Sequence, residues 1–172
     1  MKQSENQSRA PRASSTPETG RPNEAARRLE QAEALLRAGQ PKKALDVLGR
    51  SGPPSDRVTN AVGVCLLRLG EAGRAVEVFR GLALVPGTVC LRPDAPALYK
   101  TNFATALLAA GQVAGGLRVL DEIGDEQQPT VRRLRAAWRR WSEGLSLWQK
   151  VRWCLGDSPT HPVALGEAPG EL

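Results

Sequence analysis

Hydrophobic residues between about residue 24 and residue 124 recur at steps of three and four, which is the period of an amphipathic α-helix. The stretch EAARRLEQAEALLRAG (24–39) is the first to follow this period. Gly39 then predicts the end of that helix, and Pro41 suits the first turn of the next one, where its missing N–H is not needed. The segment KKALDVL (42–48) resumes the apolar period. This part of the chain is therefore predicted to form a helical hairpin with a three-residue turn.

The same order of signals returns twice along the chain. The motifs LLRAGQPKKALDVL (35–48), LLRLGEAGRAVEVF (66–79) and LLAAGQVAGGLRVL (107–120) share a leucine pair, a turn glycine and a later small residue. The turn glycines are 31 and 41 residues apart. This spacing fits a helical-hairpin repeat of about 34 residues with an insertion around LVPGTVCLRPDAP (84–96). No segment has the alternating pattern of a β-strand.

Three hairpins in one phase resemble the tetratricopeptide repeat (TPR) family, over roughly residues 24–124. The nearest match is the middle unit, NAVGVCLLRLGEAGRAVEVFRGL (60–82). By this resemblance Gly63 holds the small position of the first helix, and Phe79 holds the large packing position of the second. The other turn and packing residues of the middle unit are Leu66, Gly70 and Ala75. The corresponding residues are Ala32, Leu35, Gly39, Ala44 and Leu48 in the first unit, and Ala104, Leu107, Gly111, Gly116 and Leu120 in the third.

Two adjacent glycines interrupt the second helix of the third unit. Each of Gly115 and Gly116 costs about 1 kcal/mol relative to alanine inside a helix. The pattern leaves two interpretations open, a frayed third unit or an unusually close packing of its helices.

The resemblance implies an all-α, TPR-like solenoid of about three repeats that binds a peptide or partner protein along its concave face. Positions ten, six, three and two residues before each turn glycine usually line that face. The residues predicted to bind the partner are Glu33, Arg37, Asn60, Val64, Leu67, Arg68, Thr101 and Thr105, with Leu29, Leu36, Leu108 and Ala109 beside them. The clamp for a terminal carboxylate found in chaperone-binding relatives is not supported, because Ala61 and Leu98 stand at matching positions.

All four tryptophans lie in the segment TVRRLRAAWRRWSEGLSLWQKVRWCL (130–155), which is predicted to be one amphipathic helix of up to about 26 residues. Its apolar stripe is Leu134, Trp138, Trp141, Leu145, Trp148 and Leu155, and the basic residues opposite include Arg132, Arg135, Arg139 and Lys150. Three interpretations stay open. The helix could cap the last hairpin with its tryptophans buried, lie on a membrane surface or partner protein, or contact nucleic acid.

Composition along the chain predicts three regions. Residues 1–22 are rich in Ser, Pro, Thr, Gln and Arg, and too little of their surface is apolar to stabilise a fold, which predicts a disordered N-terminal tail. The helical domain is predicted over 23–156, with repeats at about 24–52, 55–84 and 95–125 and the cap helix at about 130–155. Three prolines and three glycines after Leu155 predict an irregular tail over 157–172, with a short docked piece around Val163 to Leu165.

The net charge of +6 is concentrated late in the chain, because residues 130–156 hold seven basic groups and one acidic group.

Hydrophobic residues make up 41% of the chain but aromatic ones only 4%, so the core must consist mainly of Leu, Val and Ala. Cys65, Cys90 and Cys154 form no CxxC pair and are predicted to be free thiols. With no secretory signal and no apolar run of membrane-spanning length, the expected location is the cytoplasm.

Catalytic chemistry has no visible set of residues. The single histidine, His161, lies in the predicted tail, and neither a phosphate-binding glycine motif nor a metal-ligand cluster accompanies it. We therefore expect a non-catalytic adaptor or scaffold that uses no cofactor, no metal and no small-molecule substrate.

Overall fold

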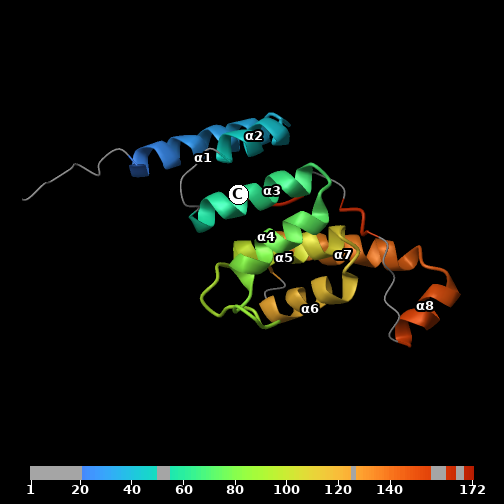
Figure 1. Cartoon of the computed structure of the whole chain (residues 1–172). Helices are drawn as coiled ribbons and strands as arrows, with labels where there is room; N and C mark the ends of the chain where they lie inside the picture. Colours follow the sequence, from blue (N-terminus) through green and yellow to red (C-terminus); the bar gives the residue numbers. More distant parts are fainter. Residues whose placement is uncertain (1–20, 50–54, 125–126, 156–161, 166–168) are drawn as a thin grey trace, which may run out of the picture.

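Helices account for most of the chain in the computed structural model, which describes residues 21–49, 55–124, 127–155, 162–165 and 169–172 (Figure 1). The helices are α1 (Arg21–Arg37), α2 (Pro41–Leu48), α3 (Asp56–Arg68), α4 (Ala72–Ala83), α5 (Ala97–Ala109), α6 (Val113–Ile123), α7 (Pro129–Glu143) and α8 (Leu147–Cys154). Within these residues no strand forms, and the one isolated bridge joins Leu84 to Leu91. The prediction of an all-α chain is confirmed.

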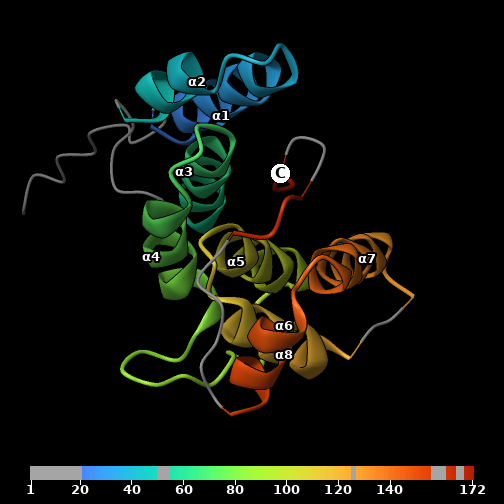
Figure 2. The same cartoon turned by 90° about the vertical axis from the view of Figure 1, so that its right-hand side faces the viewer.

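Consecutive helices pack as pairs, and the pairs follow one another along the array. Helix α1 packs on α2, α3 on α4 and α5 on α6, while α2 contacts α3 and α4 contacts α5. The first helices also meet from pair to pair, since α1 contacts α3, α3 contacts α5 and α5 contacts α7. Figure 2 shows α1, α3, α5 and α7 grouped around the residues at the C label.

The turn glycines end the first helix of each pair in the same way. Gly39, Gly70 and Gly111 have φ values of 68°, 79° and 77°, a conformation that glycine adopts without steric cost. The residue after each glycine donates its N–H to the carbonyl of the first leucine of the repeated motif, over 2.8–2.9 Å. This bond closes a Schellman cap. Capping explains why a leucine and a glycine recur at a fixed distance.

The predicted insertion lies between α4 and α5. The N–H of Val85 donates to Cys90 at 3.0 Å, and the N–H of Arg92 donates to Ala83 at 2.8 Å. These bonds close a loop whose ends, Leu84 and Leu91, are buried. The loop therefore adds length to the array while α4 still packs directly on α5.

The two adjacent glycines of α6 have different surroundings. A Cβ atom at Gly116 would lie 2.8 Å from Leu108 Cδ2, whereas one at Gly115 would lie 3.7 Å from the Leu107 methyl groups, an ordinary contact. Close packing of α5 against α6 is therefore the interpretation that holds at Gly116.

These surroundings predict opposite effects for two neighbouring alanine substitutions. Gly115→Ala is expected to stabilise the chain by about 0.5–1 kcal/mol through helix propensity. Gly116→Ala is expected to destabilise it by about 1 kcal/mol, because overpacking against Leu108 exceeds that gain. Urea unfolding followed by circular dichroism measures both, and equal stabilisation by the two substitutions would contradict the close packing at Gly116.

The prediction of a single helix over 130–155 is wrong, because two helices form there. Helix α7 ends at Glu143, and Ser146 caps α8 with a capping box in which Gln149 is the partner. Gly144 has low helix propensity, which favours a break at this position. The capping box then provides hydrogen-bond partners for backbone N–H groups at the start of α8, which the break leaves without helical partners. The buried Leu145 side chain lies at the break.

The tryptophans are not all buried as the cap interpretation predicts. Trp153 packs edge-on against Trp138 and Trp141, with ring centroids 6.4 and 5.9 Å apart. These three rings are partly buried against the core, whereas Trp148 is 74% exposed. Helix α7 does bury Val131 and packs on α5, so α7 covers the array, whereas α8 leaves Leu147, Trp148 and Val151 exposed to solvent.

The ends of the chain differ in how far the structure describes them. Helix α1 begins at Arg21, so the prediction of a disordered tail over 1–22 is wrong at residues 21–22, and the rest of that prediction, 1–20, lies outside the described residues. His161 also lies outside them. Val163 is buried and donates its N–H to Leu108 at 3.0 Å. The predicted docked piece near Val163 is therefore present at the end of α5.

Two of the three cysteines have contrasting environments. Burial in α3 raises the pKa of the Cys65 thiol to about 11, against a smaller opposing effect of Arg68, whereas Cys90 is exposed in the inserted loop. Folding raises this pKa above its usual 9.0 because burial disfavours the charged thiolate. The free energy of unfolding therefore does not depend on this group below about pH 9, and it falls as the pH rises through about 11.

We expect iodoacetamide at pH 8 to label Cys90 rapidly and Cys65 only after unfolding. The Cys65 thiol is both protonated at that pH and inaccessible to the reagent. Peptide mass spectrometry with and without urea measures the two sites separately. Rapid labelling of Cys65 in the native chain would contradict the packing of α3.

Candidate functional site

Residues 169–172 lie among the helices α1, α3, α5 and α7 and form hydrogen bonds with the last three (Figure 2). They form no helix, and Gly170 is buried although it belongs to a segment at the far end of the chain from α3. Polar side chains from α3, α5 and α7 bind this segment. The surface of α1, α3, α5 and α7 that contacts residues 169–172, with the cavities beside it, is the candidate site, and we refer to it as the groove.

Two asparagines bind the main chain of Glu171. Asn102 donates its Nδ2 to the Glu171 carbonyl at 2.7 Å and accepts the Glu171 N–H through Oδ1 at 2.9 Å. Asn60 donates to the same carbonyl at 3.2 Å and accepts a bond from Asn102 at 2.9 Å. The side chains are 1% and 3% exposed, so these bonds satisfy amides that would otherwise be buried without partners.

Arg68 joins the segment to the end of α1. Its Nε and Nη2 donate to the carbonyls of Pro169 and Gly170, at 3.4 and 3.3 Å. Its Nη1 donates to the carbonyl of Leu36 in the last turn of α1, at 3.0 Å. A cation is favourable at a helix C-terminus, where carbonyls lack helical partners. Arg68 therefore binds main-chain oxygens of both the segment and α1.

The carboxylate of Glu171 lies against the start of α7. Thr130 donates its hydroxyl to Oε1 at 2.5 Å, and Arg133 forms an ion pair with the same oxygen at 3.1 Å. The first turn of a helix also favours negative charge. The Arg133 and Glu171 side chains are about half exposed, so water screens the ion pair. It orients the Glu171 carboxylate but contributes little to the free energy of binding.

Gly170 fits where a larger residue would not. Its φ is 86°, and an added Cβ would lie 3.2 Å from Val64 and 3.3 Å from Leu67, both on α3. Side chains at positive φ are strained, and here there is also little free space. The groove therefore accepts a glycine at this place in the segment.

The groove is larger than the segment that lies in it. A cavity of about 300 Å³ and another of about 440 Å³ both border Glu33 and Leu172, and Leu172 is 42% exposed. The first is also lined by Leu29, Arg57, Asn60, Pro96, Leu98 and Tyr99, and the second by Leu36, Arg37, Arg68, Gly170 and Glu171. A ligand with a larger residue beside Glu33 could occupy this space.

The structure brings most of the residues predicted to bind a partner to the groove. Those near the segment or the cavities are Asn60, Val64, Leu67 and Arg68 of α3 and Glu33 and Arg37 of α1. Thr101 and Thr105 differ. Both are buried, and their hydroxyls donate to carbonyls of α5 itself, at 2.7–3.0 Å. On α5 the residue that binds the segment is Asn102, one position later than predicted.

Three further residues at the groove were missed from the sequence. Asn102 had a signal, since an amide inside the apolar run of α5 needs a buried partner. Thr130 and Arg133 belong to α7, for which the sequence pattern predicts a cap or a separate surface and not a wall of the groove. Their alignment with Glu171 depends on how α7 packs, which no local pattern encodes.

The basic residues predicted as an alternative surface do not all face solvent. Arg132, Arg139 and Lys150 are exposed on α7 and α8. Arg135 instead donates to Asp121 at 3.0 Å and to the Leu120 carbonyl at 3.4 Å, which ties α7 to the end of α6. Its charge therefore serves the packing of two helices.

The described ranges hold neither a metal-binding cluster nor a membrane-spanning helix. No three His, Cys, Asp or Glu side chains gather there in a set that could hold a metal ion. None of the helices described has both the length and the apolar character needed to cross a bilayer. Comparisons with protein-family models, with curated proteins and with solved structures found no match to this chain.

Proposed function

We propose that this chain is a non-catalytic protein-interaction module that binds a peptide segment of a partner protein in the groove. One observation carries the proposal: Asn60, Arg68 and Asn102 bind main-chain groups of three consecutive residues. Every peptide offers such N–H and C=O groups, whereas a small-molecule substrate need not. The module would need no cofactor, and a cytoplasmic location belongs to the same proposal.

A TPR-like solenoid is the architecture that we propose for this module. The support is the repeated Schellman turn, the packing of first helices along one side, and Gly63 and Phe79 at the positions that the resemblance assigns. Stacked hairpins share a continuous core and present an extended concave surface. An adaptor or scaffold role follows from such a surface.

Selection from a random peptide display library tests the groove directly. We expect the full chain to enrich peptides that fail to bind the double variant Asn60→Ala with Arg68→Ala, because main-chain acceptors lose their donors. A matched control, Lys42→Ala with Lys43→Ala on exposed positions of α2, should keep every enriched peptide. Equal binding by the parental chain and the groove variant, or no enrichment at all, would contradict the proposal.

A second candidate function rests on α8. Its exposed apolar side chains are Leu147, Trp148 and Val151, the exposed Leu155 follows directly, and Lys150 and Arg152 belong to the same short stretch. Exposed apolar residues beside basic ones suit the surface of an anionic membrane. No similar observation favours nucleic acid.

Tryptophan fluorescence tests the membrane candidate. Vesicles of phosphatidylcholine with phosphatidylserine are expected to shift the emission to the blue, and Trp148→Ala is expected to remove that shift, since Trp148 is the exposed ring. Vesicles of phosphatidylcholine alone are the control for charge. An unchanged emission spectrum with anionic vesicles would exclude this use of α8.

A further inference from the structure

We propose that residues 169–172 are an intramolecular competitor for the groove, and that the groove selects partner segments of the same chemistry: glycine, an acidic residue and an aliphatic residue in order. The inference rests on the proposed function, because it takes the groove to be a peptide site. The segment PGEL thereby serves both as a block and as a guide to the ligand.

Competition follows from shared atoms. The Asn102 amide uses both its oxygen and its nitrogen on Glu171, and Arg68 is divided between Leu36 and the carbonyls of Pro169 and Gly170. A second peptide cannot use these groups while the segment holds them. An incoming peptide must therefore displace residues 169–172.

Selectivity for glycine comes from α3. Positive φ and the short distances to Val64 and Leu67 both disfavour a side chain at the place of Gly170. A partner segment docked in the same way needs glycine there for the same two reasons.

Selectivity for an acidic residue comes from α7. Thr130 and Arg133 both donate to one oxygen of the Glu171 carboxylate. A glutamine would lose the ionic part of this contact, and a lysine would place two cations together. The following residue, Leu172, lies between the two cavities, where an aliphatic side chain can contact Leu29 and Leu36 on their walls.

The loss of affinity that residues 169–172 cause for a competing peptide can be estimated, because the segment and the groove belong to one chain. A segment that belongs to the same chain as its binding site competes at an effective concentration on the order of 1 mM. If the free segment binds with a Kd on the order of 0.1 mM, its presence weakens a competing peptide about tenfold. Displacement costs little elsewhere, because water can then reach Asn60 and Asn102.

The test measures fluorescence anisotropy of a labelled, amidated peptide EAPGEL with three forms of the full chain. These are the parental chain, the release variant Gly170→Val, and the control Ala164→Val, which adds volume at an exposed position of the same tail. We expect Gly170→Val to bind the peptide about tenfold more tightly than the other two. Glu171→Lys is a second release variant and should act in the same direction, with circular dichroism checking that each chain is folded.

The outcomes separate the two proposals. Equal affinity in all chains would overturn the competitor while leaving the groove as a peptide site. No binding to any chain would overturn the proposed function for this class of peptide. If EAPGQL and EAPGKL bind the released chain as tightly as EAPGEL, selection of an acidic residue is wrong. If EAPAEL does so, selection of glycine is wrong.

Discussion

Gly63→Val is expected to destabilise the chain by about 3 kcal/mol, because α3 and α4 cross too closely for any side chain at that position. A Cβ atom on Gly63 would lie 2.5–2.8 Å from the ring carbons Cζ, Cε1 and Cε2 of Phe79. Real Cβ contacts are not that short, so either the ring or the helix must move.

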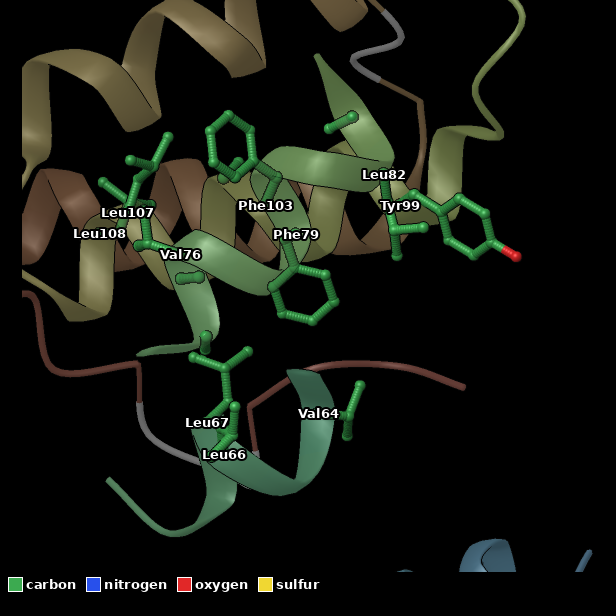
Figure 3. Close-up of a cluster of buried hydrophobic side chains, with 14 of the residues drawn as sticks. Val64, Leu66, Leu67, Val76, Phe79, Leu82, Tyr99, Phe103, Leu107 and Leu108 are labelled. Carbon is green, nitrogen blue, oxygen red and sulfur yellow. The ribbon is translucent and has the colours of Figure 1, made fainter. Parts of the chain in front are cut away.

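The ring has little freedom to move. Phe79 is fully buried, and Figure 3 shows it in the cluster with Val64, Val76 and Leu82. Interiors packed at crystal-like density convert added volume into off-rotamer side chains and backbone shifts. The loss at Gly63 is therefore expected to exceed what a helix gains when glycine is replaced.

Urea unfolding followed by circular dichroism measures the effect, with Gly81→Val as the matched control. Gly81 lies in α4 with no neighbouring atom within 4 Å of an added Cβ, so its substitution is expected to stay within about 0.5 kcal/mol of the parental chain. A double variant, Gly63→Val with Phe79→Leu, exchanges volume across the contact and should recover part of the loss. Equal effects of Gly63→Val and Gly81→Val would contradict this crossing.

Asn102→Ala is expected to release residues 169–172 and to weaken the binding of EAPGEL in the Gly170→Val background by roughly tenfold to a hundredfold, equivalent to about 1–3 kcal/mol. The substitution removes both bonds to the Glu171 main chain and the bond to Asn60. Buried groups that lose a partner cost more than the net value of one hydrogen bond.

Amide hydrogen exchange of residues 169–172 measures the release, and anisotropy measures the peptide. Thr105→Ala is the matched control on the same helix, since its hydroxyl donates to Thr101 and not to the segment. This pair of variants also compares two residues of α5. The repeat phase predicts Thr105 as a binding residue, whereas the structure shows Asn102 bound to the segment. Greater loss of peptide affinity in Thr105→Ala than in Asn102→Ala would contradict the geometry of the groove.

Local signals predicted the helices well. Periodicity located the first six helices, and the turn glycines marked the ends of α1, α3 and α5, because a Schellman cap needs only residues within one turn. The break between α7 and α8 was also encoded locally, by Gly144 and by the Ser146 and Gln149 capping box. The regular tryptophan and leucine spacing across that break favoured one helix and concealed the signal.

The sequence by itself determined the helical hairpins and their turns, because each depends on neighbours within a few positions, whereas the α3 residues of the groove came from the family resemblance. Only the tertiary structure decided that Asn102 faces the groove instead of Thr101, that α7 supplies Thr130, and that residues 169–172 lie inside. Glu171 contacts Asn60 across 111 positions of sequence. Contacts at such separation depend on the packing of the helices between them, which no pattern within one helix contains.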